Sequence, residues 1–298
     1  MKRNLIWLVL AAGCASAPSA GGGSLELLWS DGEFTEGPAR APDGSIVFSD
    51  IGNRMMRFDP RSGKVSVYRD PSGRSNGLKF DAKGRLVACE GSSTGGNRRI
   101  SITEADGTVR TLADRWEGKR FNSPNDLAID PAGNVYFTDP RYGGNDPRDL
   151  DFEGVFLVRP DGKVTLATRD VQKPNGIIAA PDGKTVYVAD NNPKGVLHLL
   201  SFRVAPDGTL ADKKVLYDFK TGRGIDGMAL GRDGLIYATA GTGDKAGIYL
   251  FSLSGEQKGF LPTPGDPTNC CFGADGTTLY ITAGAGSKFG LYRIRVGP

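Results

Sequence analysis

The chain reads Pro42-Asp43-Gly44-Ser45-Ile46-Val47-Phe48 near its beginning, an acidic turn that ends in glycine and is followed by a β-rich run. The same pattern recurs five more times, at intervals of 40 to 51 residues. The turn glycines of the six copies are Gly44, Gly84, Gly133, Gly183, Gly234 and Gly276. That interval is the length of one four-stranded propeller blade. Six copies therefore predict an all-β protein, a single six-bladed β-propeller over residues 24–298.

Each copy also predicts its own local structure. Glycine accepts a positive φ without steric cost, and the acidic side chain before it caps the turn. The segment before each turn is expected to be the innermost strand of a blade, and the run after it the second strand. Leu25-Glu26-Leu27-Leu28-Trp29 precedes the first copy. We expect this segment to close the ring as a strand of the last blade, which removes an exposed edge.

The repeats align one further position, eight residues before each turn glycine. Equivalent positions in six blades lie at one height around one axis, so these side chains are expected to converge on the central channel. Five of the six are carboxylates or carboxamides, and four are followed by glycine, which suits a backbone crowded near an axis. We call this set the axial ring, and it comprises Glu36, Asn76, Asn125, Asn175, Asp226 and Thr268.

An oxygen-rich ring with two carboxylates indicates a site for one hard divalent cation. Calcium takes six to eight oxygen ligands, and Glu36 and Asp226 together balance a 2+ charge while the asparagines add neutral donors. Calcium is therefore the expected metal, with magnesium, manganese and zinc as alternatives on ligand chemistry. In the opposing interpretation, the channel holds only water bonded to these polar side chains.

Other residue types argue against several functional classes. The sole histidine, His198, lies in the apolar run Val196-Leu197-His198-Leu199-Leu200 and is expected to pack on an outer strand. A Ser-His-Asp hydrolase and a histidine-liganded zinc enzyme are therefore not expected. A net charge of +3 without any concentration of Lys and Arg excludes nucleic acid as the expected partner.

Acidic residues also recur near the end of each predicted second strand, where repetition favours a structural role, the capping of the following loop. The long segment 141–153 is either a lid over the channel or a surface insertion. The recurring acids are Asp50, Glu90, Asp139 and Asp190.

The first 20 residues are not expected to belong to the propeller. Lys2 and Arg3 precede an apolar run from Leu5 to Ala12 that is too short to span a bilayer, the pattern of a signal peptide. This predicts an extracytoplasmic protein, periplasmic or secreted. Cleavage after small residues in 15–20 would release a soluble protein. Alternatively, Leu10-Ala11-Ala12-Gly13-Cys14 is similar to a lipoprotein box, which would place a lipid on Cys14 and tether the chain to a membrane.

Five segments carry a resemblance to a known family. With these segments the chain resembles the senescence-marker-protein, gluconolactonase and luciferin-regenerating-enzyme-like family, six-bladed propellers that include regucalcin, gluconolactonase and diisopropyl-fluorophosphatase-like proteins. The segments are Thr35-Glu36-Gly37-Pro38, Asn122-Ser123-Pro124-Asn125-Asp126, Tyr136-Phe137-Thr138-Asp139-Pro140-Arg141-Tyr142-Gly143, Pro174-Asn175-Gly176 and Ile225-Asp226-Gly227-Met228.

The resemblance implies a metal-dependent hydrolase that opens a lactone or related ester. It implies metal ligation by Glu36, Asn125, Asn175 and Asp226, with Asp226 as the general base. Asn76, Asn125 and Thr268 are expected to contact the substrate. Regucalcin-like members carry a substrate-binding arginine where this chain has Ser123, so the motif is more similar to that of bacterial gluconolactonases.

Two alternatives stand beside lactone hydrolysis. The same metal would polarise a P=O group as readily as a C=O group, which allows a phosphotriesterase-like hydrolase. A propeller with a structural metal could also act as a non-catalytic extracytoplasmic binding protein, which predicts metal-dependent melting without turnover.

Overall fold

The computed structural model describes residues 23–91, 95–143 and 145–297. The predicted signal peptide and Cys14 lie outside these residues. Each of the first three blades is one antiparallel four-stranded sheet. Blade 1 contains β2 (Thr35–Arg40), β3 (Ile46–Asp50), β4 (Arg54–Asp59) and β5 (Lys64–Arg69). Blade 2 contains β6 (Ser75–Phe80), β7 (Leu86–Glu90), β8 (Arg99–Thr103) and β9 (Val109–Ala113). Blade 3 contains β12 (Leu127–Ile129), β13 (Val135–Asp139), β14 (Gly154–Val158) and β15 (Val164–Thr168).

The second half of the chain repeats this arrangement. Blade 4 contains β16 (Pro174–Ala179), β17 (Thr185–Asn191), β18 (Leu197–Val204) and β19 (Leu210–Asp218). Blade 5 contains β20 (Met228–Leu230), β21 (Ile236–Ala240), β22 (Gly247–Phe251) and β23 (Gln257–Pro262). Blade 6 contains β24 (Pro267–Phe272), β25 (Thr278–Ala285), β26 (Lys288–Arg295) and, from the other end of the chain, β1 (Glu26–Gly32).

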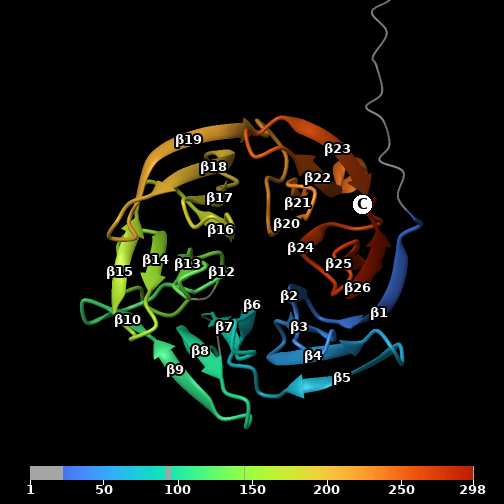
Figure 1. Ribbon diagram of the computed structural model, residues 1–298, viewed down its shortest axis with the longest axis horizontal. Coiled ribbons are helices and arrows are strands. Elements are labelled where there is room, and N and C mark those ends of the chain that lie inside the picture. Colours follow the sequence, from blue (N-terminus) through green and yellow to red (C-terminus); the bar gives the residue numbers. More distant parts are fainter. Residues whose placement is uncertain (1–22, 92–94, 144, 298) are drawn as a thin grey trace, which may run out of the picture.

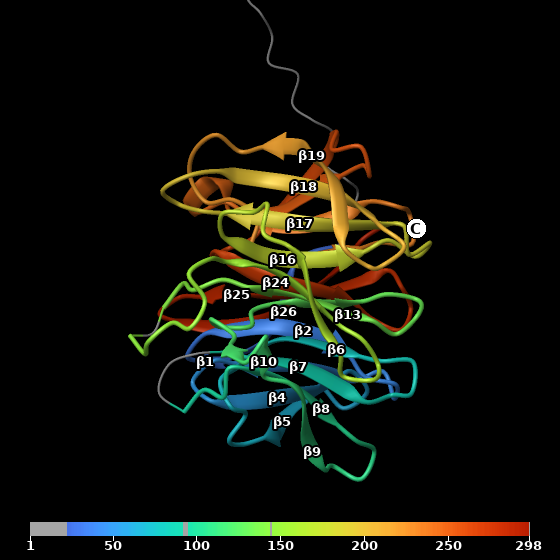
Figure 2. The same ribbon diagram turned by 90° about the vertical axis from the view of Figure 1, so that its left-hand side faces the viewer.

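The six sheets stand around a common axis, and the predicted six-bladed propeller is confirmed (Figure 1). Strands β2, β6, β12, β16, β20 and β24 form the inner circle, and each contacts the next. Figure 2 shows blade 4 from its side, with β16 to β19 stacked from the axis to the rim. A short hairpin of β10 (Arg115–Trp116) and β11 (Lys119–Arg120) precedes blade 3. In the described part of the chain the only helical element is a 3₁₀ turn, η1 (Gly243–Lys245), and none of its helices could cross a membrane.

The N-terminal strand closes the ring as predicted. β1 pairs antiparallel with β26, with Glu26 opposite Arg293 and Trp29 opposite Leu291. A salt bridge of 2.7 Å joins the first of these pairs. Because this strand supplies the outer edge of blade 6, the first and last parts of the chain share one sheet.

The turn chemistry predicted from the repeats is also present. In the first copy, Asp43 Oδ1 accepts the Ser45 N–H at 3.0 Å, and Gly44 has a φ of +86°. A β-carbon at this φ would strain the turn, so the glycine is required by conformation. The same carboxylate-to-amide bond, two residues along, occurs after Asp182 and Asp233.

Apolar side chains pack between neighbouring blades. The buried residues form six clusters, one at each blade interface of the described structure. The cluster between blades 2 and 3 includes Phe121, Phe137 and Phe156, whose rings lie 4.9 to 5.6 Å apart. These clusters fix the tilt of each blade and hence the height at which its inner strand meets the axis.

Candidate functional site

The axial ring lies where the inner strands begin. Glu36, Asn175 and Thr268 are residues of β2, β16 and β24, whereas Asn125 and Asp226 directly precede β12 and β20. Backbone hydrogen bonds join neighbouring blades at this height, from Gly77 to Asn125 O (2.7 Å), from Gly176 to Asp226 O (2.6 Å) and from Gly227 to Thr268 O (2.8 Å). The predicted alignment of the repeats is therefore visible as backbone hydrogen bonds between blades 2 and 3, blades 4 and 5, and blades 5 and 6.

The glycines that follow ring residues are required by close approach. A β-carbon on Gly37 would lie 2.1 Å from Asn76 O, and one on Gly176 would lie 2.3 Å from Asp226 O. Such distances are far inside van der Waals contact, and the obstructing atoms are backbone. The crowding inferred from the repeats is confirmed, and it explains how six polar side chains can approach one axis.

Two buried carboxyl groups dominate the electrostatics of the ring. Glu36 is 4% exposed. Burial raises its pKa well above the usual value, and the Asp226 and Asp126 carboxylates raise that pKa further, while the Gly37 N–H and Arg223 offset part of the effect. Burial also raises the pKa of Asp226, which Arg223 and a hydrogen bond with Asn175 partly lower again. Glu36, Asn175 and Asp226 are thus brought together at one end of the axis.

Arg223 is a site residue that the repeats did not indicate. Its guanidinium forms a salt bridge with Asp226 and donates to Pro267 O at 2.7 Å and to Gly241 O at 3.3 Å. These contacts anchor it between blades 5 and 6. The guanidinium therefore orients the Asp226 carboxylate and stabilises its charged form.

Asp126 is a second residue that sequence reasoning missed. It is 3% exposed, and its carboxylate accepts the Leu127 N–H at 2.9 Å and the Asn269 side-chain amide at 3.3 Å. Residues 126 and 269 follow ring positions in blades 3 and 6, which face each other across the axis, so their side chains bridge the channel. We call this pair the axial plug. The sequence does mark these two residues, because the equivalent position in the other four blades is glycine.

The two remaining predicted substrate contacts are placed differently. Asn76 is partly exposed at the ring, and its carbonyl accepts the Ser49 hydroxyl at 2.7 Å. Thr268 is 1% exposed, and its hydroxyl contacts Thr35 O at 2.7 Å and the Thr282 hydroxyl at 2.8 Å. The Thr268 side chain is thus engaged in joining β24 to blade 1 and to β25.

Three of the four recurring second-strand carboxylates support the ring, although not as predicted. Asp50, Asp139 and Asp190 cap the segment before the inner strand of their own blade, not the loop that follows them. Glu90 differs, because it accepts the Asn97 side-chain amide of the following loop at 2.6 Å. Asp139 accepts the N–H groups of Asn122 and Ser123, both at 2.7 Å. Asp50 and Asp190 accept from the amides at the equivalent positions of blades 1 and 4. In each of these three blades the two amides lie three and two residues before the ring position. The buried carboxylate therefore faces the segment that leads into the inner strand of its own blade.

The segment 141–153 borders the ring. The Tyr142 hydroxyl donates to Asn191 O (3.0 Å) and Lys173 O (3.2 Å) and also hydrogen-bonds the Asn175 side chain. The Lys173 ammonium lies 5.1 Å from the Tyr142 ring centroid and 3.0 Å from Glu153. The segment is thereby anchored to blade 4 beside Asn175, and its action as a lid stays a prediction.

Trp116, His198 and three cysteines lie in structural surroundings. Trp116 packs edge-to-face against Phe152, at 5.9 Å between centroids, on the outside of blade 3. His198 lies on β18, the third strand of blade 4, 3.6 Å from Asp218. Three cysteines of the described chain are buried and form no disulfide, namely Cys89, Cys270 and Cys271.

Comparison with known proteins agrees with this geometry. A sequence profile of the SMP-30/Gluconolactonase/LRE-like region matches residues 34–285. The chain belongs to this family. A gluconolactonase of Zymomonas mobilis is 32% identical over 289 residues, which cover 87% of this chain and 78% of that protein.

Solved structures show the same relationship. A gluconolactonase from Xanthomonas campestris superposes with a TM-score of 0.82 at 31% identity, and the match covers 94% of this chain and 91% of that one. A calcium-binding regucalcin from Agrobacterium tumefaciens has a TM-score of 0.74 at 19% identity, with 92% and 93% covered, and it shares the fold.

In this member of the SMP-30/gluconolactonase/LRE-like family, the axial ring mixes acids with amides. Among the described residues, no three His, Cys, Asp or Glu side chains gather in a metal-type cluster. Any cation held on the axis would therefore rely on the asparagine carbonyls as well as on Glu36 and Asp226.

Proposed function

We propose that this protein is a metal-dependent lactonase that opens a sugar lactone at the axial ring. The observation that carries the proposal is the convergence of Glu36, Asn175 and Asp226, two buried acids and an amide, on the axis of a gluconolactonase-family propeller. Gluconolactonases about one-third identical to the chain over most of its length support the lactone as substrate class.

The charge of the site fits a divalent cation. Glu36, Asp126 and Asp226 carry three negative charges when ionised, and Arg223 offsets one of them. Lys79 lies near Asp126 and offsets a second charge, and the net negative charge that stays buried near the axis is costly unless it is balanced. Glu36, Asn125, Asn175 and Asp226 would hold the ion, and their oxygen donors suit calcium first and magnesium, manganese or zinc next. When bound, the ion would supply polarisation of the lactone carbonyl.

In this proposal Asp226 moves the proton. Its carboxylate would take a proton from water as the water oxygen bonds to the carbonyl carbon. The ring C–O bond then breaks, and the same proton passes to the departing alkoxide, so that the product is an open-chain hydroxy acid. Arg223 and Asn175 hold the Asp226 carboxylate in one orientation during these steps. Asn76 and Asn125 would contact the substrate oxygens.

Hydrolysis of δ-gluconolactone by the mature domain tests the proposal. Turnover should disappear in EDTA and return with added calcium. Asp226→Ala should lower kcat by at least about 100-fold, the usual contribution of a positioned general base. Near-normal kcat in that variant with calcium bound would remove Asp226 from the mechanism. Turnover of phosphotriesters with none of lactones, or calcium binding without turnover of either, would refute lactone hydrolysis.

A further inference from the structure

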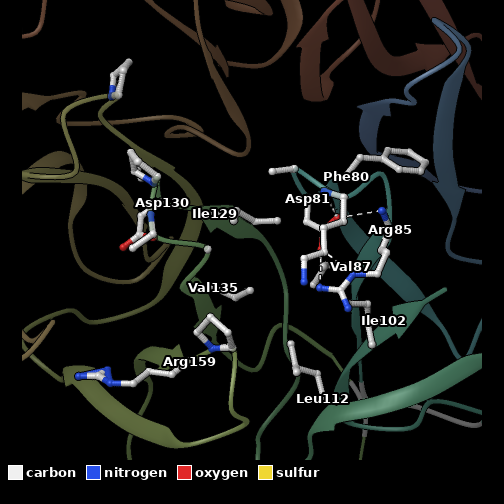
Figure 3. A pocket seen from close by; sticks show the side chains of 18 of the residues that line it. Phe80, Asp81, Arg85, Val87, Ile102, Leu112, Ile129, Asp130, Val135 and Arg159 are labelled. Atoms are coloured by element: carbon white, nitrogen blue, oxygen red, sulfur yellow. Dashed lines mark hydrogen bonds and ion pairs between the residues drawn. The ribbon is translucent and has the colours of Figure 1, made fainter. Parts of the chain in front are cut away.

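The face opposite the axial ring, where the Asp-Gly turns lie, carries two adjoining cavities. The larger, about 730 Å³, lies between blades 2 and 3 (Figure 3). The smaller, about 320 Å³, lies at the far end of the axis. The two share the lining residues Phe80, Ile129 and Ala179. We call the combined space the far-face cavity, and its volume is that of a site for a small organic ligand.

The larger part has an apolar floor. Val87, Ile102 and Val135 belong to the buried cluster between blades 2 and 3, and Leu112 and Ile129 pack against that cluster while they remain partly exposed. Their side chains project toward the middle of the cavity in Figure 3. An apolar-lined cavity of this size, with Leu112 and Ile129 partly exposed in it, indicates a ligand with an apolar body.

Cations outnumber carboxylates around this floor, although two of them are already paired, Arg85 with Asp81 and Arg110 with Glu104. The two lining carboxylates are both used by their own turns: Asp81 accepts the Lys83 and Arg85 amides and the Arg85 guanidinium, and Asp130 accepts two amides and the Asn134 side chain. Arg85 and Arg159 lie on opposite sides of the cavity in Figure 3. The cations that line the larger part are Lys83, Arg85, Arg110 and Arg159.

The smaller part contains two cations and no carboxylate in its lining. These are Arg40 at the end of β2 and Lys79 near the end of β6. Within the described residues, neither side chain makes a hydrogen bond or an ion pair. Burial raises the pKa of Asp126 in the axial plug and Lys79 lowers it again, so Asp126 offsets part of the Lys79 charge. Arg40 and Lys79 together still leave a positive charge beside an apolar wall that includes Phe272 and Leu230, and this charge would attract an anionic group.

The axial plug separates this cavity from the ring. Asp126 and Asn269 each lie one residue after a ring position. Arg40 lies four residues after the ring position of its strand and Lys79 three residues after that of its strand, so both lie nearer the turns. The hydrogen bond between the plug side chains, 3.3 Å long, therefore crosses the axis between the two sites. A ligand in the far-face cavity would not displace a substrate at the ring.

We propose that the far-face cavity binds an amphipathic monoanion, a carboxylate attached to an apolar body. The carboxylate would lie against Arg40 and Lys79, and the body would extend past Phe80 and Ile129 over the apolar floor. Charge complementarity selects the anion, and the floor selects the apolar body. A sugar acid has the negative charge but no apolar body, and a neutral alcohol with an apolar chain lacks the charge.

Fluorescence of anilinonaphthalene sulfonate, itself an amphipathic anion, provides the test on the folded protein. Decanoate should displace this probe, whereas gluconate and decanol should not. Decanoate should also leave hydrolysis at the ring unchanged. Equal displacement of the probe by decanol would show that the cavity does not recognise the negative charge of the ligand. Competition between decanoate and the lactone would place the anion at the ring. Either result would overturn the proposal.

Variants locate the site. Arg40→Gln combined with Lys79→Gln should weaken decanoate at least about fivefold, the effect of losing roughly 1 kcal/mol of attraction. Ala179→Phe should also weaken the binding of decanoate, because the larger side chain narrows the junction between the two parts of the cavity. The control is Lys64→Gln, which removes an exposed lysine from β5 in blade 1. If decanoate binds the double variant and the control equally well, the site is not in the far-face cavity; unchanged melting temperatures exclude misfolding.

Discussion

Arg223 shows how a single residue can set the chemistry of a ring carboxylate. It lies three positions before Asp226, and its positive charge partly cancels the rise in the Asp226 pKa caused by burial. A general base works only when deprotonated, so in the proposed mechanism the pKa of Asp226 would set the acidic limit of activity. Arg223 and Asp226 are close in the sequence, and Arg223 is held in place by contacts with Gly241 and Pro267.

Arg223→Met should shift the acidic limb of the kcat/KM profile to higher pH. Loss of the cation removes the main influence that lowers the pKa of Asp226, so activity near about pH 6 should fall severalfold while activity near about pH 8 changes less. Arg223→Lys should recover part of the shift, because it restores the charge. A uniform loss of activity with an unmoved pH profile would show that Arg223 acts only on structure.

At the scale of the element, the N-terminal strand β1 connects the two ends of the propeller. Trp29 of this strand is half-buried and packs edge-to-face on Phe48 of blade 1, with 5.5 Å between ring centroids. Leu27 on the same strand is 49% exposed. Closure therefore combines the hydrogen bonds to β26 with apolar contact across the junction of blades 6 and 1.

Trp29→Ala should lower the free energy of unfolding by about 2 kcal/mol, somewhat less than for a fully buried tryptophan. Leu27→Ala is the matched control on the same strand and should cost less than about 1 kcal/mol. Urea denaturation of both variants measures the difference. Equal losses would mean that pairing of β1 with β26, and not the Trp29 contact, stabilises the junction.

At the scale of the whole molecule, the six blades converge on several buried acids whose pKa values are raised. Such groups bind more protons in the native state than in the unfolded state over the affected range. Stability of the metal-free protein should therefore be fully present below the ordinary carboxyl pKa and decline as the pH rises through the raised values. The groups concerned are Glu36, Asp126 and Asp226.

A cation on the axis should reverse this trend. It binds the ionised carboxylates, so the increase in Tm caused by calcium should be larger near about pH 8 than near about pH 5. Melting curves in EDTA and in calcium measure the difference in Tm caused by calcium at each of the two pH values. Glu36→Gln should reduce that difference near about pH 8. A calcium effect that is independent of pH would contradict ligation by Glu36.

The sequence by itself determined the number of blades, the inner and second strands, the closing strand and the heights of the ring residues. These follow from a turn repeated six times, and turn chemistry is local: Asp43 caps Ser45 two residues away. Residues at the same distance in sequence from the turn glycine lie at the same height along the axis. The sequence therefore already predicted that Glu36 and Asp226 lie close together.

Only the tertiary structure decided which side chains meet once the ring is closed. The axial plug joins residues 143 positions apart, and the Tyr142 hydroxyl reaches blade 4 from a segment inserted in blade 3. The far-face cavity likewise depends on how blades 2 and 3 pack. Such contacts arise from the tilt of the blades and from loop paths, which no repeat encodes. The role of the Asp139 carboxylate was misassigned for the same reason, since its partners Asn122 and Ser123 lie in the segment before β12 and not in the loop after β13.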